Sequence, residues 1–207
     1  GIATSVPEVL VGTVAALDGK TTLAIGNAVG SNIANIGLVL GATALISPLV
    51  VLSPTLKREY LFMFAAIGVA TLLLVDGYLS RLDGIILLTC LVLSMWWIIR
   101  LARSAPKTDP IVKEFEQELS QETTYSVWKS SLLLALGLLL LLGGAELLVR
   151  GAVAIAREFG VSDLIIGLTI VAIGTSLPEL AASIMSVIKN EADIAIGNVI
   201  GSNMFNM

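Results

Sequence analysis

The chain has 207 residues, of which 56% are apolar and 14% are charged, against about 25% charged residues in an ordinary soluble domain. This composition excludes a disordered chain and argues against a soluble globular domain. The net charge of −4 gives no support for nucleic-acid binding. There is no histidine, and the single cysteine, Cys90, can form neither an internal disulfide nor a zinc-binding cluster.

Seven helical segments are predicted, and several offer the run of about 20 apolar residues that crosses a bilayer. In chain order, a helix already in progress ends near Leu17, further helices cover about 22–46, 59–75, 84–101, 128–149 and 162–188, and a seventh begins near Asp193. Ser-Pro pairs at 47–48 and 53–54 indicate a loop, and Asp-Gly at 76–77 indicates a turn. The only long hydrophilic segment is 102–127, which is either a solvated connector or a cation sensor.

The basic residues indicate the orientation in the membrane. If successive loops alternate sides, one side collects Lys57, Arg58, Arg100, Arg103, Lys107, Lys113, Lys129 and Lys189, and the other collects Lys20, Arg81, Arg150 and Arg157. The positive-inside rule places the first set, and with it the loop at 102–127, in the cytoplasm. We therefore predict an integral protein of the plasma (inner) membrane.

An internal repeat is the strongest signal in the sequence. TSVPE at 4–8 recurs as TSLPE at 175–179, and AIGNAVGSN at 24–32 recurs as AIGNVIGSN at 195–203, both 171 positions apart. Residues 1–36 align with 172–207 without a gap and share 13 identities. By the predicted topology the two copies cross the membrane in opposite directions. This inverted arrangement is typical of secondary transporters, which hold their ions near the midplane between the repeats.

The Thr-Ser-x-Pro-Glu motif favours a cation site. Glu8 and Glu179 lie in apolar helices that contain no Lys or Arg to pair with them, and intramembrane carboxylates are usually functional. Proline also frees the carbonyl of the residue four positions earlier. If Thr4, Ser5 and Glu8 share a helix face, their oxygens together suit a hard cation such as Ca²⁺ or Na⁺.

The second motif predicts a polar stripe on a neighbouring helix. Asn27, Ser31 and Asn35 follow one another at four-residue steps, and Asn198, Ser202 and Asn206 repeat the pattern. Glycines at 26 and 30, repeated at 197 and 201, allow close helix approach. We expect the stripe to face the Thr-Ser-x-Pro-Glu helix, with the glycines bringing the two together. Glu146, outside the repeat, is interpreted as interfacial or structural.

The motifs GTSLPE at 174–179 and GNVIGSN at 197–203 resemble the α-repeat signature of sodium/calcium exchangers, and the first repeat resembles it too. The resemblance implies an all-α membrane protein of ten helices in two inverted halves of five. Residues 1–101 would then be the first half without its first helix, 102–127 the cytoplasmic loop, and 128–207 the second half, ending early in its third helix. About seven full or partial membrane helices are expected in this chain.

The resemblance also implies the roles of individual residues. Glu8 and Glu179 would be the carboxylates shared by Ca²⁺ and Na⁺, with Asn35 and Asn206 facing them. Backbone carbonyls would come from Thr4 and Thr175, and also from Gly1 and Ala172. The outer Na⁺ ligands would be Ser5, Ser31, Ser176 and Ser202. Some members carry Asp where this chain has Asn206, which argues against K⁺ dependence.

The sequence thus predicts a non-enzymatic antiporter that exchanges Na⁺ for Ca²⁺ by alternating access. Its partners would be the two transported ions and the lipid bilayer, and no obligatory protein partner is inferred. An H⁺/Ca²⁺ antiporter is the nearest alternative. A passive channel is less favoured because the polar residues gather at one depth. An intramembrane hydrolase is less favoured because the chain has no histidine and its only cysteine, Cys90, lies apart from the motifs.

Overall fold

The computed structural model describes residues 4–120 and 126–207, and the elements in them are helical. In chain order they are α1 (Val6–Leu17), α2 (Thr21–Ala34), η1 (Asn35–Leu40), α3 (Gly41–Ile46), α4 (Pro54–Leu74), α5 (Arg81–Arg103), α6 (Pro110–Ser120), α7 (Val127–Glu158), α8 (Asp163–Ile166), η2 (Gly167–Val171), α9 (Ala172–Thr175), α10 (Leu177–Ile188) and α11 (Ala192–Phe205). The segments η1 and η2 are short π-helices inside longer helical runs.

The predicted helices are all present, with three differences in extent. The third begins at Pro54, where the Ser53 hydroxyl accepts a hydrogen bond from the backbone N–H of Leu56 and caps the helix. The fifth continues to Glu158, nine residues beyond its expected end. The sixth is divided into α8, η2, α9 and α10, and the break falls at the Pro178 motif.

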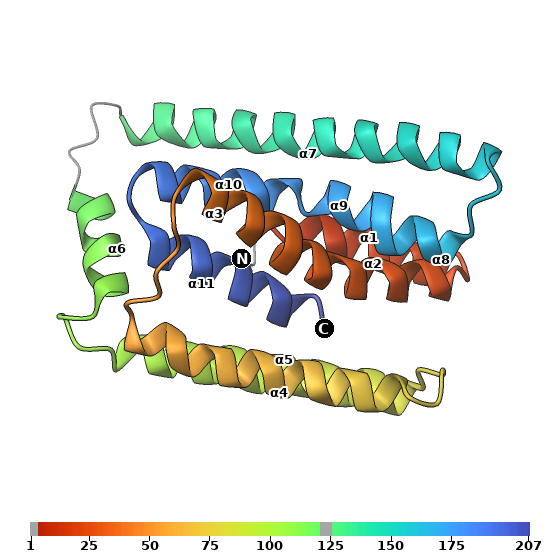
Figure 1. The fold of residues 1–207 in the computed structure, drawn as a ribbon, viewed down its shortest axis with the longest axis horizontal. Coiled ribbons are helices and arrows are strands. Elements are labelled where there is room, and N and C mark those ends of the chain that lie inside the picture. Colours follow the sequence, from red (N-terminus) through yellow and green to blue (C-terminus); the bar gives the residue numbers. More distant parts are fainter. Residues whose placement is uncertain (1–3, 121–125) are drawn as a thin grey trace.

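The helices form three layers (Figure 1). The long helix α7 lies on one side, the antiparallel pair α4 and α5 lies on the other, and the two sequence repeats fill the middle layer. The α1–α2 hairpin points to one end of the molecule and the α10–α11 hairpin points to the opposite end, so the repeats are inverted. We call the end that holds α6 the loop end.

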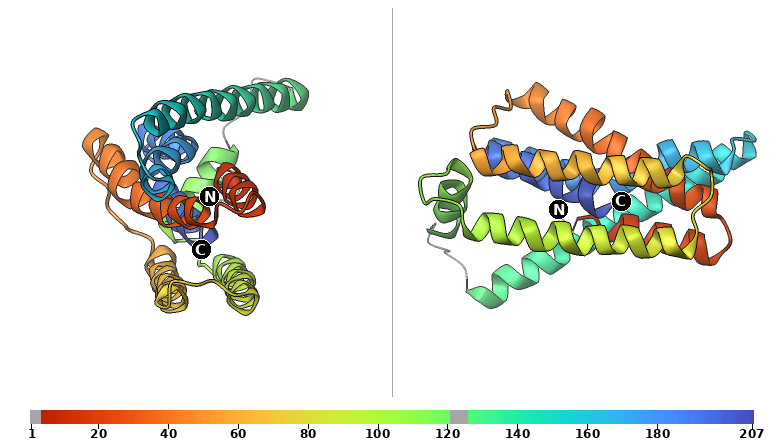
Figure 2. Two further views of the ribbon diagram at one scale, coloured as in Figure 1. Left: turned by 90° about the vertical axis from the view of Figure 1, so that its right-hand side faces the viewer. Right: turned by 90° about the horizontal axis from the view of Figure 1, so that it is seen from below.

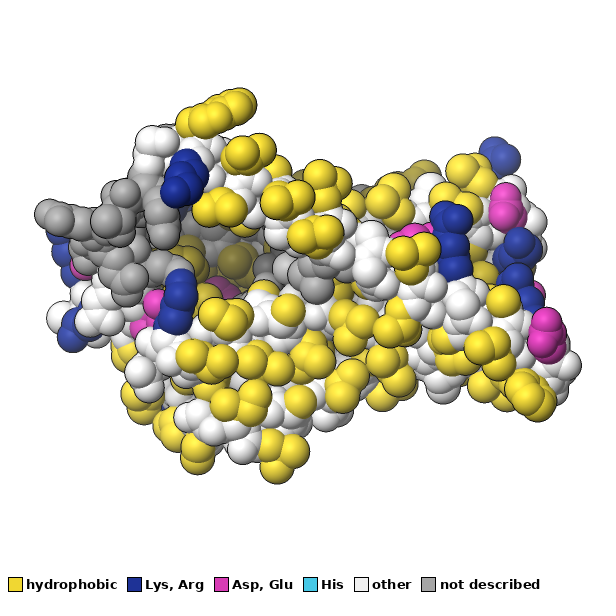
Figure 3. Space-filling view, turned by 90° about the horizontal axis from the view of Figure 1, so that it is seen from above, with side chains coloured by type: hydrophobic (Ala, Val, Ile, Leu, Met, Phe, Trp, Pro, Cys, Tyr) yellow, Lys and Arg dark blue, Asp and Glu magenta, His cyan; other side chains and the backbone are white. Residues whose placement is uncertain are grey.

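Much of the outer surface is apolar. Four helical runs in the described residues are long and apolar enough to cross a membrane: Thr21–Ile46, Arg81–Arg103, Trp128–Glu158 and Asp163–Ile188. None of the residues in the apolar window of α5 is buried, which suits a helix facing lipid rather than water. In the view of Figure 3, charged side chains gather toward the two ends and hydrophobic ones cover the middle.

The described part of the hydrophilic segment, up to Ser120, contacts α4 and α11. Helix α6 packs against α11, and Ile111 contacts the core around Leu56 and Ile196. Asp109 accepts hydrogen bonds from the backbone N–H and hydroxyl of Thr55, the hydroxyl at 2.6 Å. Glu114 accepts from the first backbone N–H groups of α11, at 3.4 and 3.0 Å. The loop therefore ties the starts of α4 and α11 together, which the sequence pattern did not predict.

Burial acts to raise the pKa of Asp109, but hydrogen bonds from Ser53, Thr55 and Ile111 outweigh it and hold that pKa below its ordinary value. The carboxylate is therefore charged at neutral pH. A charged carboxylate next to a helix N-terminus is favourable, because it interacts with the unpaired N–H groups and the positive end of the helix dipole.

Candidate functional site

The two Thr-Ser-x-Pro-Glu motifs mark helix starts in the middle of the molecule. Pro7 and Pro178 lie in the first two positions of α1 and α10, where a missing N–H costs nothing. Thr4 and Ser5 precede α1, so the expectation that they share a helix face with Glu8 is wrong in detail. In the second repeat, α9 ends at Thr175 and α10 begins at Leu177, so the proline motif interrupts the helical run between the threonine and the glutamate.

The motif hydroxyl reaches the opposite repeat instead of its own glutamate. Glu8 and Glu179 are 3% and 0% exposed. The hydroxyl of Ser5 donates to Oε1 of Glu179 at 2.9 Å, and the hydroxyl of Ser202 donates to the same oxygen at 3.3 Å. One carboxylate of the second repeat is thus oriented by both copies.

The polar stripe of α2 and η1 also connects the repeats. Asn27 donates to the backbone carbonyl of Glu8 at 3.2 Å and accepts from the hydroxyl of Thr175 at 3.4 Å. Ser31 and Thr175 lie within hydrogen-bond distance, at 3.3 Å. Asn35 donates to Oδ1 of Asn203 at 3.0 Å. As expected, the stripe faces the first motif, and it faces the second motif as well.

The glycines of the stripe have a different partner from the one expected. A Cβ atom on Gly30 would lie 2.6 Å from the carbonyl oxygen of Leu168, and one on Gly26 would lie 3.1 Å from that of Leu164. These glycines bring α2 against α8 and η2 of the second repeat, not against α1. In the second repeat, Gly197 instead faces Leu56 of α4.

Several buried polar atoms around the two carboxylates have no hydrogen-bond partner. They include both side-chain oxygens of Glu8, Oε2 of Glu179, Oγ of Ser176 and Oδ1 of Asn35. Among the described residues, the ion pairs are Lys20–Asp18, Arg150–Glu146 and Arg157–Asp163, and none includes Glu8 or Glu179. Buried carboxylates without a basic partner are costly unless a cation or a proton compensates their charge.

The remaining candidate residues differ from one another in burial and in hydrogen bonding. Thr4 is half-buried, and Ala172 is fully buried with its carbonyl accepting a hydrogen bond from the N–H of Ser176 at 3.1 Å. Asn206 is buried at the end of α11 with both side-chain heteroatoms unpartnered, and it lines a cavity of about 270 Å³ between α2 and α4. Gly1 lies outside the described residues.

Two polar residues near the site were not among the candidates. Asn203 is fully buried and pairs with Asn35, and its place in the repeated GSN motif was the available signal. Ser183 is fully buried one turn after Glu179 and has an unpartnered hydroxyl. The repeat carried no signal for it, because the matching position holds Gly12.

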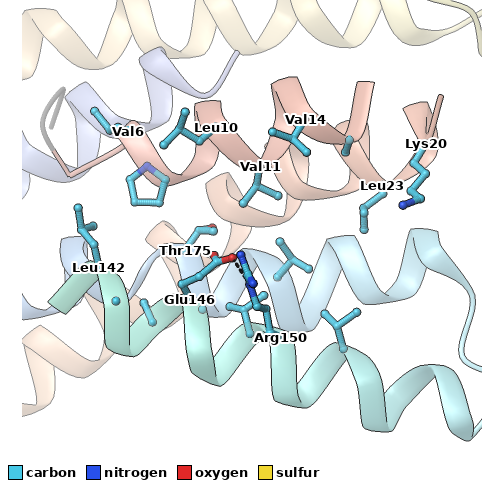
Figure 4. A pocket seen from close by; sticks show the side chains of 18 of the residues that line it. Val6, Leu10, Val11, Val14, Lys20, Leu23, Leu142, Glu146, Arg150 and Thr175 are labelled. Carbon is cyan, nitrogen blue, oxygen red and sulfur yellow. Dashed lines mark hydrogen bonds and ion pairs between the residues drawn. The ribbon is translucent and has the colours of Figure 1, made fainter. Parts of the chain in front are cut away.

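A groove leads from the surface to the site. It has a volume of about 680 Å³, is lined mainly by apolar residues of α1 and α7, and reaches Thr175. Figure 4 shows Glu146 and Arg150 of α7 on its wall, joined by an ion pair of 2.6 Å. Both side chains of this pair are exposed, so it contributes little to stability, about 0.3–0.5 kcal/mol.

Comparison with known proteins decides the family. The sodium/calcium exchanger protein family matches residues 1–100 and 129–207, which include both repeats. This chain belongs to the sodium/calcium exchanger family. It is 48% identical to CaxA of Alkalimonas amylolytica over 98% of this chain, and 45% identical to the inner membrane protein YrbG of Escherichia coli over 100% of this chain. It is 30% identical to the sodium/calcium exchanger MaX1 of Methanosarcina acetivorans, covering 68% of that protein.

The solved structure of the sodium/calcium exchanger from Methanococcus jannaschii has the same fold. It matches 99% of this exchanger-family chain with a TM-score of 0.69 and 35% identity. The chain spans 63% of that structure and 63% of CaxA and YrbG. The predicted family, the all-α membrane fold and the inverted helix arrangement are thereby confirmed.

Proposed function

We propose that this chain forms the central part of a secondary active antiporter that exchanges Na⁺ for Ca²⁺ by alternating access. Glu8 and Glu179 hold the transported ions between the two inverted repeats. The further ligands are the expected set of hydroxyl, amide and carbonyl groups: Thr4, Ser5, Ser31, Asn35, Ala172, Thr175, Ser176, Ser202 and Asn206. Ca²⁺ and Na⁺ are substrates, not resident cofactors.

One observation carries the proposal: two buried carboxylates from opposite repeats lie among unpartnered oxygens, and no basic side chain within 4–120 or 126–207 forms an ion pair with either. Oxygen ligands of this kind suit hard cations and do not suit Zn²⁺ or Cu⁺. Because both repeats contribute, a relative movement of the repeats changes access to the ion from either side. The basic residues support a cytoplasmic position for the loop end and an inner-membrane location.

Na⁺ coupling is favoured over H⁺ coupling by the hydroxyl groups. A proton carrier needs only the carboxylates, whereas Ser5, Ser31, Ser176 and Ser202 add fully buried hydroxyl oxygens around them. Such oxygens are suitable ligands for Na⁺, whereas proton transport by a carboxylate does not require four of them. The name of MaX1, a sodium/calcium exchanger, supports the same assignment.

Replacement of one carboxylate tests the site. In the full-length protein, Glu179→Gln is expected to weaken Ca²⁺ binding by about 150- to 4000-fold, because loss of one partner of a buried charge pair costs about 3–5 kcal/mol. Calorimetric titration with Ca²⁺ measures the affinity, and thermal unfolding in detergent checks the fold.

Glu146→Gln is the matched control, because Glu146 is half-exposed and already paired with Arg150. We expect it to bind Ca²⁺ within threefold of the unmodified protein. Retained Ca²⁺ binding and Ca²⁺ flux in Glu179→Gln would overturn the assignment of the site.

A further inference from the structure

The hydroxyl of Ser183 lacks the hydrogen bond that several other helical hydroxyl groups make in the part of the chain that the structure describes. Such groups within apolar helices usually donate to the carbonyl four residues earlier. Thr43 donates to Val39 at 2.6 Å, Thr71 to Ile67 at 2.8 Å, Thr89 to Ile85 at 2.7 Å and Thr169 to Ile165 at 2.6 Å. Ser183 is fully buried, and its Oγ has no hydrogen-bond partner.

An unpartnered hydroxyl in a buried position costs about 1–3 kcal/mol and calls for a physical reason. Ser183 follows Glu179 by four residues, so the two side chains lie on the same face of α10, and Glu179 Oε2 is unpartnered too. Helix α10 packs against η1, which begins with Asn35, whose Oδ1 also lacks a partner. The group of buried oxygens without a hydrogen-bond partner thus extends one helical turn beyond the Glu179 carboxylate.

Ser183 lies nearer the loop end of the molecule than Glu179 does. Helix α10 runs from Glu179 toward the loop end and ends at Ile188. Helix α11 begins at the same end and contacts α6. The next buried residue on the same face is Val187, which is apolar. Ser183 therefore lies between the Glu179 carboxylate and the buried apolar side chain of Val187, which is nearer the loop end.

The two repeats differ at this point. The position that matches Ser183 in the first repeat is Gly12, which has no side chain, and the position that matches Val187 is Ala16. On this helix face, a polar residue therefore follows Glu179 by one turn toward the loop end, whereas the matching position after Glu8 has no side chain.

We propose that Ser183 is an additional cation-contacting residue, which binds the ion as it moves between the central site and the loop end. The hydroxyl oxygen replaces part of the ion's hydration shell before the ion reaches water, as hydroxyl and carbonyl oxygens do for hard cations. The inference rests on the proposed exchange of Na⁺ for Ca²⁺ at Glu8 and Glu179 and adds a contact on one side only.

Sided transport measurements test it. Using the full-length protein in right-side-out and inverted membrane vesicles, we expect Ser183→Ala to raise the apparent KM for Ca²⁺ presented at the loop end by about three- to tenfold. The KM at the opposite face and the equilibrium affinity for Ca²⁺ should change less than twofold. Thr169→Val is the control, because that hydroxyl is bonded to its own helix, and it should leave both KM values within twofold.

A second measurement does not depend on transport by the variant. Ser183→Cys and Val187→Cys are compared in a full-length background without other cysteines, using a cationic methanethiosulfonate reagent. We expect Ser183→Cys to react at least tenfold faster than Val187→Cys in ion-free buffer, and saturating Ca²⁺ to slow this reaction at least fivefold.

The outcomes separate the two proposals. Unchanged KM values in Ser183→Ala, or no protection of Ser183→Cys by Ca²⁺, would overturn the role of Ser183 while Ca²⁺ binding by the unmodified protein leaves the exchanger assignment intact. No Ca²⁺ binding by the unmodified protein would overturn both.

Discussion

Two serines that the sequence repeat makes equivalent have different surroundings. Ser5 donates to Glu179 at 2.9 Å, whereas Ser176, its counterpart, is fully buried without a partner for its hydroxyl. A hydrogen bond to a charged group contributes about 1.5–3 kcal/mol, while a buried unpartnered hydroxyl is itself destabilising. The same substitution should therefore have different effects on the ion-free protein at the two positions.

We expect Ser5→Ala to lower the free energy of unfolding of the ion-free protein by about 1–3 kcal/mol. Ser176→Ala should leave it unchanged or raise it, while reducing the stabilisation that added Na⁺ provides. Thermal unfolding of full-length protein in detergent, with and without Na⁺, measures both effects. Equal losses in ion-free buffer would show that the two serines are equivalent, contrary to the structure.

At the scale of residues, the repeat singles out most of the candidate ligands twice, and their role in binding the ion stays a prediction. Their partners could not be predicted: Ser5 was expected to act with Glu8, and it contacts Glu179 instead. Sequence spacing reports neighbours along one helix, whereas this contact crosses between chain segments 174 residues apart. Ser183 was missed for a related reason, since it lies next to the motif but has no counterpart in the other repeat.

At the scale of helices, the position of the site depends on one close crossing. Helix α2 packs against η2 so tightly that a Cβ on Gly30 would lie 2.6 Å from the Leu168 carbonyl and 2.7 Å from the Ala172 Cβ. Those contacts involve backbone and a short side chain, neither of which can move aside easily. The crossing brings Ser31 and Asn27 to Thr175, so it aligns candidate ligands of both repeats, Ser31 and Thr175.

We expect Gly30→Ala to destabilise the full-length protein by about 1–3 kcal/mol through overpacking and to reduce Na⁺-driven Ca²⁺ transport at least tenfold. Gly12→Ala is the matched control, because a Cβ there meets nothing within 4 Å, and alanine in a helix is favoured over glycine by about 1 kcal/mol. It should retain transport and unfold at an equal or higher temperature. Similar transport in the two variants would contradict the importance of this crossing.

The helices themselves were largely predictable, because long apolar runs and proline positions determine where they begin and end. The π-helical segments η1 and η2 were not predicted, since they arise where a helix adjusts to its neighbours. Helix α6 was also missed. Its attachment depends on Asp109 and Glu114 accepting hydrogen bonds from segments distant in sequence, which a charged stretch alone does not reveal.

For the whole molecule, inversion of the two repeats is the property that connects fold and function. It was predictable, because a gap-free repeat of polar motifs combined with the positions of basic residues specifies antiparallel copies. In the structure the hairpins α1–α2 and α10–α11 point to opposite ends, and the hydrogen bond from Ser5 to Glu179 joins the two repeats at one of the buried carboxylates. A site shared in this way can be opened to either side by moving one repeat against the other.

The most direct test is Ca²⁺ uptake into vesicles that contain the full-length protein, with and without an outward Na⁺ gradient, at the same pH on both sides. The proposed exchange predicts uptake that depends on the Na⁺ gradient and is lost when the gradient is dissipated. Uptake that ignores Na⁺ and follows an imposed pH gradient would contradict Na⁺ coupling and make Glu8 and Glu179 proton carriers.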